Sequence, residues 1–104
     1  MDCFIIDNIT EGDVEDRLLR ILKKNKKYFP IAYNENTHGY DLQIKVGANI
    51  YDRQYNYIKN MSGRLYLGVD LCRDILKINA SDKLVVVVLE ENKLYQIINL
   101  RTQL

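Results

Sequence analysis

The chain has 104 residues, 47% of them hydrophobic and 28% charged, with a formal net charge of +1. This length predicts one domain, residues 1–104, around a single hydrophobic core. The near-neutral charge argues against a strongly acidic DNA mimic, and it removes the simplest argument for nucleic-acid binding, a strongly basic domain.

The N-terminal part of the sequence predicts a short strand followed by a long helix. Residues 3–6 are an apolar run typical of a strand. Thr10 is a candidate N-cap, and residues 11–27 carry apolar side chains at helical spacing. Acidic residues crowd the beginning of this segment and basic residues its end, as the helix macrodipole favours. We therefore predict a helix over 11–27 that ends before Pro30.

The remaining residues predict a succession of strands and turns. Apolar and polar residues alternate over 41–46 and again over 51–59, with a turn at 47–49, which predicts a hairpin. Further expected elements are a turn at 60–63, a strand at 65–69, a short helix at about 71–77, a strand at 84–89 and a returning strand at 94–100.

The segment 84–89 is apolar at all six positions. An antiparallel hairpin with one wet face normally alternates apolar and polar residues. The continuous run therefore indicates a strand covered on both faces, either by the helix expected at 11–27 or by a second copy of the chain.

Several short motifs follow one another at nearly constant spacing in the C-terminal half. They are Gly63-Arg64, Arg73-Asp74, Leu76-Lys77-Ile78, Ser81-Asp82-Lys83-Leu84 and Glu90-Glu91. In this order they resemble the AbrB/MazE/SpoVT family of swapped-hairpin proteins over about residues 55–100. The first 50 residues have no counterpart in the minimal family unit, and Gly68 stands where the family has proline.

The resemblance implies both a fold and a function. The expected fold is α+β, with an N-terminal helix and an antiparallel β meander, and an AbrB-like hairpin–short helix–hairpin in the C-terminal half. Residues 1–50 would be a helix and hairpin extension, and residues 51–104 the AbrB-like β unit. The resemblance also implies an intertwined homodimer that binds double-stranded DNA, with Lys59, Arg64 and Arg73 as the DNA-binding residues.

The densest positive charge in the sequence lies near the end of the helix expected at 11–27. Its members are Arg20, Lys23, Lys24, Lys26 and Lys27. Four of them, Arg20, Lys23, Lys24 and Lys27, are candidates for contacts with phosphates or with a partner. The alternative is that they form the solvated end of a helix whose dipole favours cations there, and this interpretation is preferred.

A stripe of aromatic and basic residues, Tyr51, Arg53, Tyr55 and Tyr57, lies on one face of the strand expected at 51–59. Such a stripe is typical of a protein interface or of a platform that stacks single-stranded bases. Ordinary cross-strand packing explains it equally well.

Catalytic and metal-binding patterns are absent from the sequence. His38 is the single histidine, and neither Cys3 nor Cys72 has metal-ligand spacing to it. We expect both cysteines to be small core residues in a reducing compartment. The sequence therefore predicts a cytoplasmic protein that is not an enzyme, without metal, cofactor or membrane span.

Two functions fit these features. The first is a small homodimeric DNA-binding regulator similar to AbrB-like transition-state regulators or antitoxins. The alternative is a protein-binding module, such as a phage or mobile-element inhibitor, that binds a host or cognate protein through the tyrosine-rich strand and the N-terminal extension.

Overall fold

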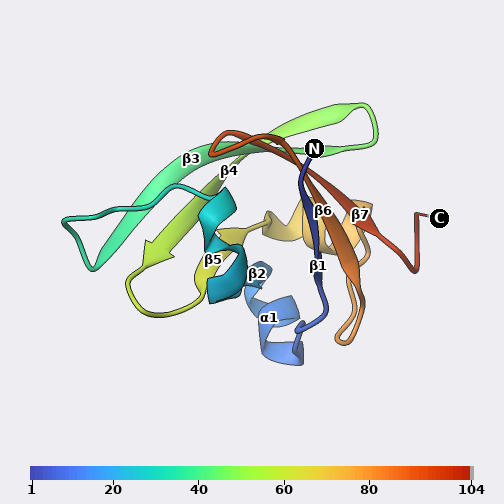
Figure 1. Ribbon diagram of the computed structural model, residues 1–104. Coiled ribbons are helices and arrows are strands. Elements are labelled where there is room, and N and C mark those ends of the chain that lie inside the picture. The colour runs from blue at the N-terminus through green and yellow to red at the C-terminus, as the bar shows by residue number, and fades with distance from the viewer. Residues whose placement is uncertain (104) are drawn as a thin grey trace.

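The computed structural model describes residues 1–103, and its seven strands form one mixed sheet that curves into a nearly closed barrel (Figure 1). The order across the sheet is β1-β6-β7-β3-β4-β5-β2. The strands are β1 (Cys3–Ile6), β2 (Leu18–Ile21), β3 (Thr37–Val46), β4 (Asn49–Ile58), β5 (Gly63–Tyr66), β6 (Leu84–Glu90) and β7 (Leu94–Asn99). The helical elements are α1 (Glu11–Asp16), the 3-10 helix η1 (Lys23–Tyr28) and the π-helix η2 (Asp70–Ile75).

The predicted fold class, an α+β protein with an N-terminal helix, an antiparallel meander and an AbrB-like C-terminal half, is wrong. The sheet is mixed, because β3 runs parallel to β7, with Ile44 opposite Tyr95. In addition, β1 pairs with β6 and β2 pairs with β5. These pairings join segments that are distant in sequence, so local periodicity carries no sign of them.

The long helix predicted over 11–27 is also wrong. Thr10 does cap a helix, through reciprocal hydrogen bonds with Asp13, but α1 ends at Asp16. Arg17 then takes a left-handed backbone conformation, with φ 56°, which ends the helix. The next four residues form β2, and the lysines follow in η1. The apolar residues of β2 lie at spacings that fit a helix as well as a strand.

Most other local predictions are confirmed, but the strand expected at 65–69 is β5, which begins at Gly63 and ends at Tyr66. Strands are present where the sequence predicts them at the N-terminus, in the hairpin β3–β4 and in the pair β6–β7. The hairpin turn contains Gly47 with φ 59°, a conformation that glycine adopts without strain. The short helix expected at 71–77 is η2.

Aromatic rings fill the middle of the barrel. Phe29, which follows η1, stacks on Tyr95 with 4.3 Å between ring centroids and on Tyr55 at 4.7 Å. All three side chains are fully buried. Cys72 lies in the core as predicted, whereas Cys3 is exposed, because it faces outward from the edge strand β1.

Strand β6 has one buried face and one half-exposed face. Leu84 and Val86 are fully buried and point into the barrel, whereas Val85 and Val87 are partly exposed on the outside. Of the two alternatives for covering the outer face, the first helix is wrong, since α1 packs beside β2 (Figure 1). A second copy of the chain stays a prediction.

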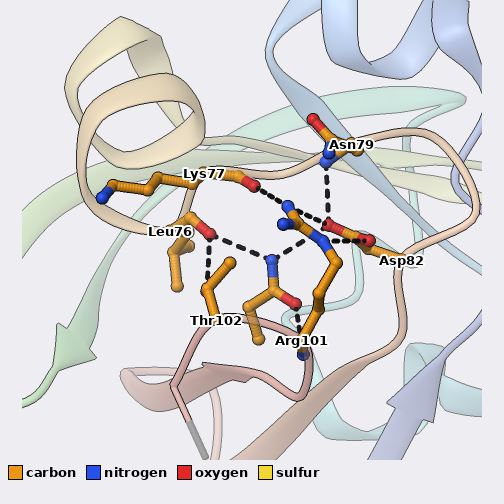
Figure 2. A network of polar contacts seen from close by, with 7 residues as sticks. Leu76, Lys77, Asn79, Asp82, Arg101 and Thr102 are labelled. Carbon is orange, nitrogen blue, oxygen red and sulfur yellow. Dashed lines mark hydrogen bonds and ion pairs between the residues drawn. The ribbon is translucent and has the colours of Figure 1, made fainter.

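A buried polar network fastens the end of β7 to the segment after η2 (Figure 2). The Asp82 carboxylate accepts hydrogen bonds from Arg101 Nε at 2.9 Å, from the Asn79 backbone N–H at 2.8 Å and from the Asn99 amide at 3.1 Å. The same amide of Asn99 donates to the Leu76 carbonyl at 2.9 Å. The Arg101 guanidinium, with the Asn79 and Asn99 donors adding to its effect, lowers the pKa of Asp82 from 3.8 to about 2 although burial opposes it.

Candidate nucleic-acid interface

Positive charge is concentrated in two segments of the chain. Residues 21–34 and 54–69 together carry six lysines and arginines and no acidic residue. Because the net charge of the whole chain is +1, the remaining residues carry a net charge of −5. A near-neutral protein can therefore still have one strongly basic face.

The antiparallel pairing of β2 with β5 brings the two segments together. Ile21, the last residue of β2, lies opposite Gly63, the first residue of β5. Helix η1 follows β2 directly and so lies against the turn between β4 and β5. Lys26 of η1 fastens this contact, since its ammonium donates to the carbonyls of Ile58 at 2.6 Å and Met61 at 2.7 Å.

Lys26 is held in place by an aromatic ring as well as by carbonyls. Its Nζ lies 4.5 Å from the centre of the Tyr57 ring, a cation–π contact. Burial lowers the pKa of Lys26, and the neighbouring charge of Lys23 lowers it further. Lys26 thus positions the turn, whereas the exposed Lys23, Lys24 and Lys27 are available to a ligand.

Lys59 and Arg64 flank the other side of this contact. Both side chains are exposed, Lys59 in the β4–β5 turn and Arg64 on β5. We call the surface formed by η1, this turn and β5 the basic surface. Its cations are Lys23, Lys24, Lys26, Lys27, Lys59 and Arg64.

Arg20 and Arg64 are cross-strand neighbours with different surroundings. The Arg20 side chain donates to both carboxylate oxygens of Asp13, at 3.0 and 3.1 Å, and to the Asn8 carbonyl at 2.7 Å. Within residues 1–103, no acidic group lies within 4.0 Å of the Arg64 guanidinium. Two like charges opposite each other on a strand pair repel, and here Asp13 neutralises only one of them.

The structure contradicts the helix-dipole explanation of the lysine cluster. Lys23, Lys24 and Lys27 lie on η1, a separate 3-10 helix after β2, and not at the end of a long helix with acids at its beginning. Contacts of these exposed lysines with phosphates or a partner stay a prediction.

Arg73 lies apart from the other two residues that the family resemblance implies for DNA binding. It is exposed on η2 and forms an ion pair with the adjacent Asp74 at 2.8 Å. Its side chain lines a cavity beside α1, whereas the cavity at η1 is lined by lysines, Tyr57 and Asn60. The structure therefore groups Lys59 with Arg64 and leaves Arg73 in a second region.

The residues of the tyrosine stripe are buried to different degrees. Tyr55 is fully buried, so the interpretation that its side chain binds a partner is wrong. Tyr51 and Tyr57 are partly buried and pack against the core. Arg53 donates to the Leu67 carbonyl at 2.6 Å and to Asp70 at 2.7 Å, and it lowers the pKa of that carboxyl. Two-residue periodicity alone does not tell which face of a strand is inside.

Residues 1–103 show few features of a catalytic site, a metal site or a membrane span. His38 lies on the surface, with its ring Nδ1 2.6 Å from Glu35. Among residues 1–103, no three His, Cys, Asp or Glu side chains are grouped so that they could hold a metal ion. No helix there has the length and hydropathy needed to cross a membrane.

The fold occurs in a solved complex with DNA. A chain of the Arabidopsis FUS3–DNA complex matches this protein with a TM-score of 0.67 and 16% sequence identity. The match covers 92% of this chain and 93% of that chain, so the two share a fold over nearly their whole length. No family model and no curated protein sequence matches the chain. The resemblance to the AbrB/MazE/SpoVT family stays a prediction.

Sequence reasoning missed the role of Lys26. It was part of the lysine cluster, but its hydrogen bonds reach the carbonyls of residues 32 and 35 positions further along the chain. The signal in the sequence was the absence of acids from both 21–34 and 54–69, which marks two segments that can share one face.

Proposed function

We propose that this protein is a DNA-binding domain whose basic surface contacts the phosphates of double-stranded DNA. The observation that carries the proposal is the basic surface itself, where η1, the β4–β5 turn and β5 gather six cations without an acid among residues 21–34 and 54–69. The likeness in fold to a chain of the FUS3–DNA complex supports it.

The chemistry of the basic surface fits a phosphate backbone. Lysine ammoniums and arginine guanidiniums on an exposed surface displace the counterions of DNA, which is the main source of nonspecific affinity. Asn60 in the turn and Arg64 on β5 add side chains that can hydrogen-bond to phosphates or to base edges. The acid-free segments also avoid the repulsion that carboxylates would exert on phosphates.

Duplex DNA fits better than single-stranded nucleic acid. A single-strand site needs exposed aromatic faces on which bases stack. In the tyrosine stripe that could provide them, Tyr55 is fully buried and Tyr51 and Tyr57 are partly buried against the core.

The test is a titration of a fluorescent DNA duplex, followed by anisotropy over a series of salt concentrations. The unmodified protein should bind with an affinity that falls steeply with salt. A variant with Lys23→Gln and Lys27→Gln should reduce the slope of log K against log salt by about 0.9 for each phosphate that is no longer neutralised.

A matched control separates this surface from charge in general. Lys83 and Lys93 are exposed lysines outside the basic surface, so Lys83→Gln with Lys93→Gln removes the same charge elsewhere. The proposal fails if no duplex binding is detected at low salt, or if both double variants weaken binding equally.

The finer statements of function stay predictions. A role in transcription regulation, a homodimer, a cytoplasmic location and the absence of catalysis are expected from the sequence. Molar mass in solution tests the homodimer. The alternative function, a protein-binding module, cannot use the buried Tyr55 but keeps the exposed residues of the N-terminal half, and a pull-down with an immobilised copy of the chain tests it.

A further inference from the structure

A second cationic region lies at the opposite end of β2 from η1. It surrounds a cavity of about 380 Å³ between α1, η2 and the residues that follow η2. Arg17, which lines it, precedes β2, whereas Lys23 comes after β2. Four extended residues separate the two ends by roughly 13 Å. We call this cavity the cationic pocket.

The charged residues that line the pocket are mostly positive. They are Arg17, Arg73, Lys77 and Arg101, with Glu15 as the single acid among the lining residues. Asp74 neutralises Arg73 at 2.8 Å, and Asp82 neutralises Arg101 at 2.9 Å. Within residues 1–103, neither Arg17 nor Lys77 has an acidic partner within 4.0 Å. Two positive charges are therefore left over to face the single charge of Glu15.

One guanidinium of the pocket is fixed before any ligand binds. Arg101 Nε and Nη2 are held by the Asp82 carboxylate and the Lys77 carbonyl (Figure 2). Arg101 Nη1 makes no hydrogen bond to residues 1–103, and so it is a donor that can bind a ligand without losing rotational freedom. The Lys77 ammonium extends away from this network (Figure 2), and its long flexible stem lets it turn towards a ligand.

The rest of the lining is apolar and held together. Val14, Cys72 and Ile78 contribute to the wall, and the Cys72 thiol lies 4.0 Å from the Val14 carbonyl, joining η2 to α1. The volume lies in the range of small-molecule sites, roughly 300–1,000 Å³. A bare anion would leave most of this space unfilled, so the matching ligand has an organic part as well as a charged group.

We propose that the cationic pocket binds a phosphate monoester carried by a small organic molecule, such as a mononucleotide. A phosphate monoester carries about two negative charges at neutral pH and has three strong acceptor oxygens, which matches Arg17, Lys77 and the free donor of Arg101. A shallower hollow adjoins the pocket and contains Glu11 and Glu15. These acids repel phosphate, so the phosphate lies at the arginine end and the organic part lies over Val14 and Ile78.

The proposal does not depend on DNA binding by the basic surface. Calorimetric titration with adenosine 5′-monophosphate, with adenosine and with inorganic phosphate tests it directly. We expect saturable binding of the nucleotide, weaker binding of phosphate and none of adenosine. Arg17→Gln and Lys77→Gln should each weaken nucleotide binding by about tenfold, the effect of removing one charged hydrogen bond. Lys93→Gln removes a charge outside the pocket and should leave the binding unchanged.

Two further measurements separate a free nucleotide from the phosphates of DNA. Arg17→Gln and Lys77→Gln should keep duplex affinity, and the nucleotide should not displace a bound duplex. The proposal is overturned if the nucleotide does not bind saturably, if neither pocket variant weakens it, or if the pocket variants lose duplex affinity in parallel, since the pocket would then be part of the DNA surface. If duplex binding is absent while the nucleotide binds as expected, the pocket stands and the proposed function fails.

Discussion

The basic surface and the Asp82 network both contain cations, but the cations of the two regions have different partners within the fold. In the Asp82 network, Arg101 is engaged by a carboxylate whose side chain is 7% exposed, and the Arg101 and Asn99 donors connect the end of β7 to the loop before β6. On the basic surface, Lys26 donates hydrogen bonds to two carbonyls, whereas no hydrogen bond or ion pair to residues 1–103 holds the exposed side chains of Lys23, Lys24, Lys27, Lys59 and Arg64.

This difference indicates what each group of charges is for. A buried carboxylate with several donors contributes to stability, and removing it leaves donors without partners. Unpaired cations gathered on one face repel one another and contribute nothing to folding. The number of charges in a region is therefore a poor guide, and their partners within the fold separate structural charges from candidate binding charges.

Asp82→Ala should have the largest effect on stability. The substitution leaves the Asn79 N–H without an acceptor and frees the Arg101 guanidinium, so the free energy of unfolding should fall by about 3 kcal/mol. Urea denaturation followed by circular dichroism measures it. Duplex affinity of the folded fraction should not change. A decrease below about 0.5 kcal/mol would contradict the structural role of the network.

Acid should weaken the same network. The pKa of Asp82 is lowered from 3.8 to about 2 in the folded protein. The ionised carboxylate therefore adds its full contribution to the free energy of unfolding above about pH 4, and this contribution is lost as the pH falls towards 2. The loss amounts to about 2 kcal/mol. Urea denaturation of the unmodified protein and of Asp82→Asn at pH 5 and pH 2.5 measures it, and the variant should lose less stability over this interval. Equal losses in both proteins would show that other carboxylates cause the acid dependence.

The neighbours Arg20 and Arg64 provide a matched pair within one strand pairing. Arg20→Gln breaks the ion pair with the largely buried Asp13, and should lower the free energy of unfolding by about 1–2 kcal/mol. Arg64→Gln breaks no ion pair, and should change stability by less than about 0.5 kcal/mol while weakening duplex binding. Thermal unfolding and anisotropy on both variants measure these effects. If Arg64→Gln is the more destabilising of the two, the distinction between a structural Arg20 and a binding Arg64 is wrong.

Two buried tyrosines test whether partners within the fold also decide the contribution of uncharged polar groups to stability. Their expected effects are the smallest. The Tyr95 hydroxyl donates to the Tyr28 carbonyl and accepts from the Asn92 N–H, so Tyr95→Phe should cost about 1 kcal/mol. The buried Tyr55 hydroxyl makes no hydrogen bond to residues 1–103, so Tyr55→Phe should leave stability unchanged or raise it by up to about 1 kcal/mol. Melting temperatures of the two variants should shift in opposite directions or differ clearly in size.

Local structure was largely readable from the sequence where a short-range cause determines it. The cap at Thr10, the turn at Gly47 and the strand pair β6–β7 depend on neighbouring residues, and the structure confirms them. The helix predicted over 11–27 failed because Leu18, Leu19 and Ile21 fit a helical stripe and a buried strand equally well. Their partner strand β5 decided between the two.

The candidate site was only partly readable for the same reason. The family resemblance suggested Lys59 and Arg64, and the charge pattern suggested the lysine cluster, but their assembly into one surface depends on the pairing of Ile21 with Gly63. The same resemblance suggested Arg73, and the fold places it beside another cavity. The orientation of the tyrosine stripe depended on which face of β4 the barrel encloses, and this is a property of the whole sheet.

The pairing of β1 with β6 has a consequence for synthesis. Phe4 lies opposite Val86, so a growing chain on the ribosome has no partner for β1 until the residues of β6 have emerged. Folding dominated by such distant pairings is slow, in the range of milliseconds to seconds. During translation the unpaired edge of β1 is open to aggregation or to protection by a chaperone.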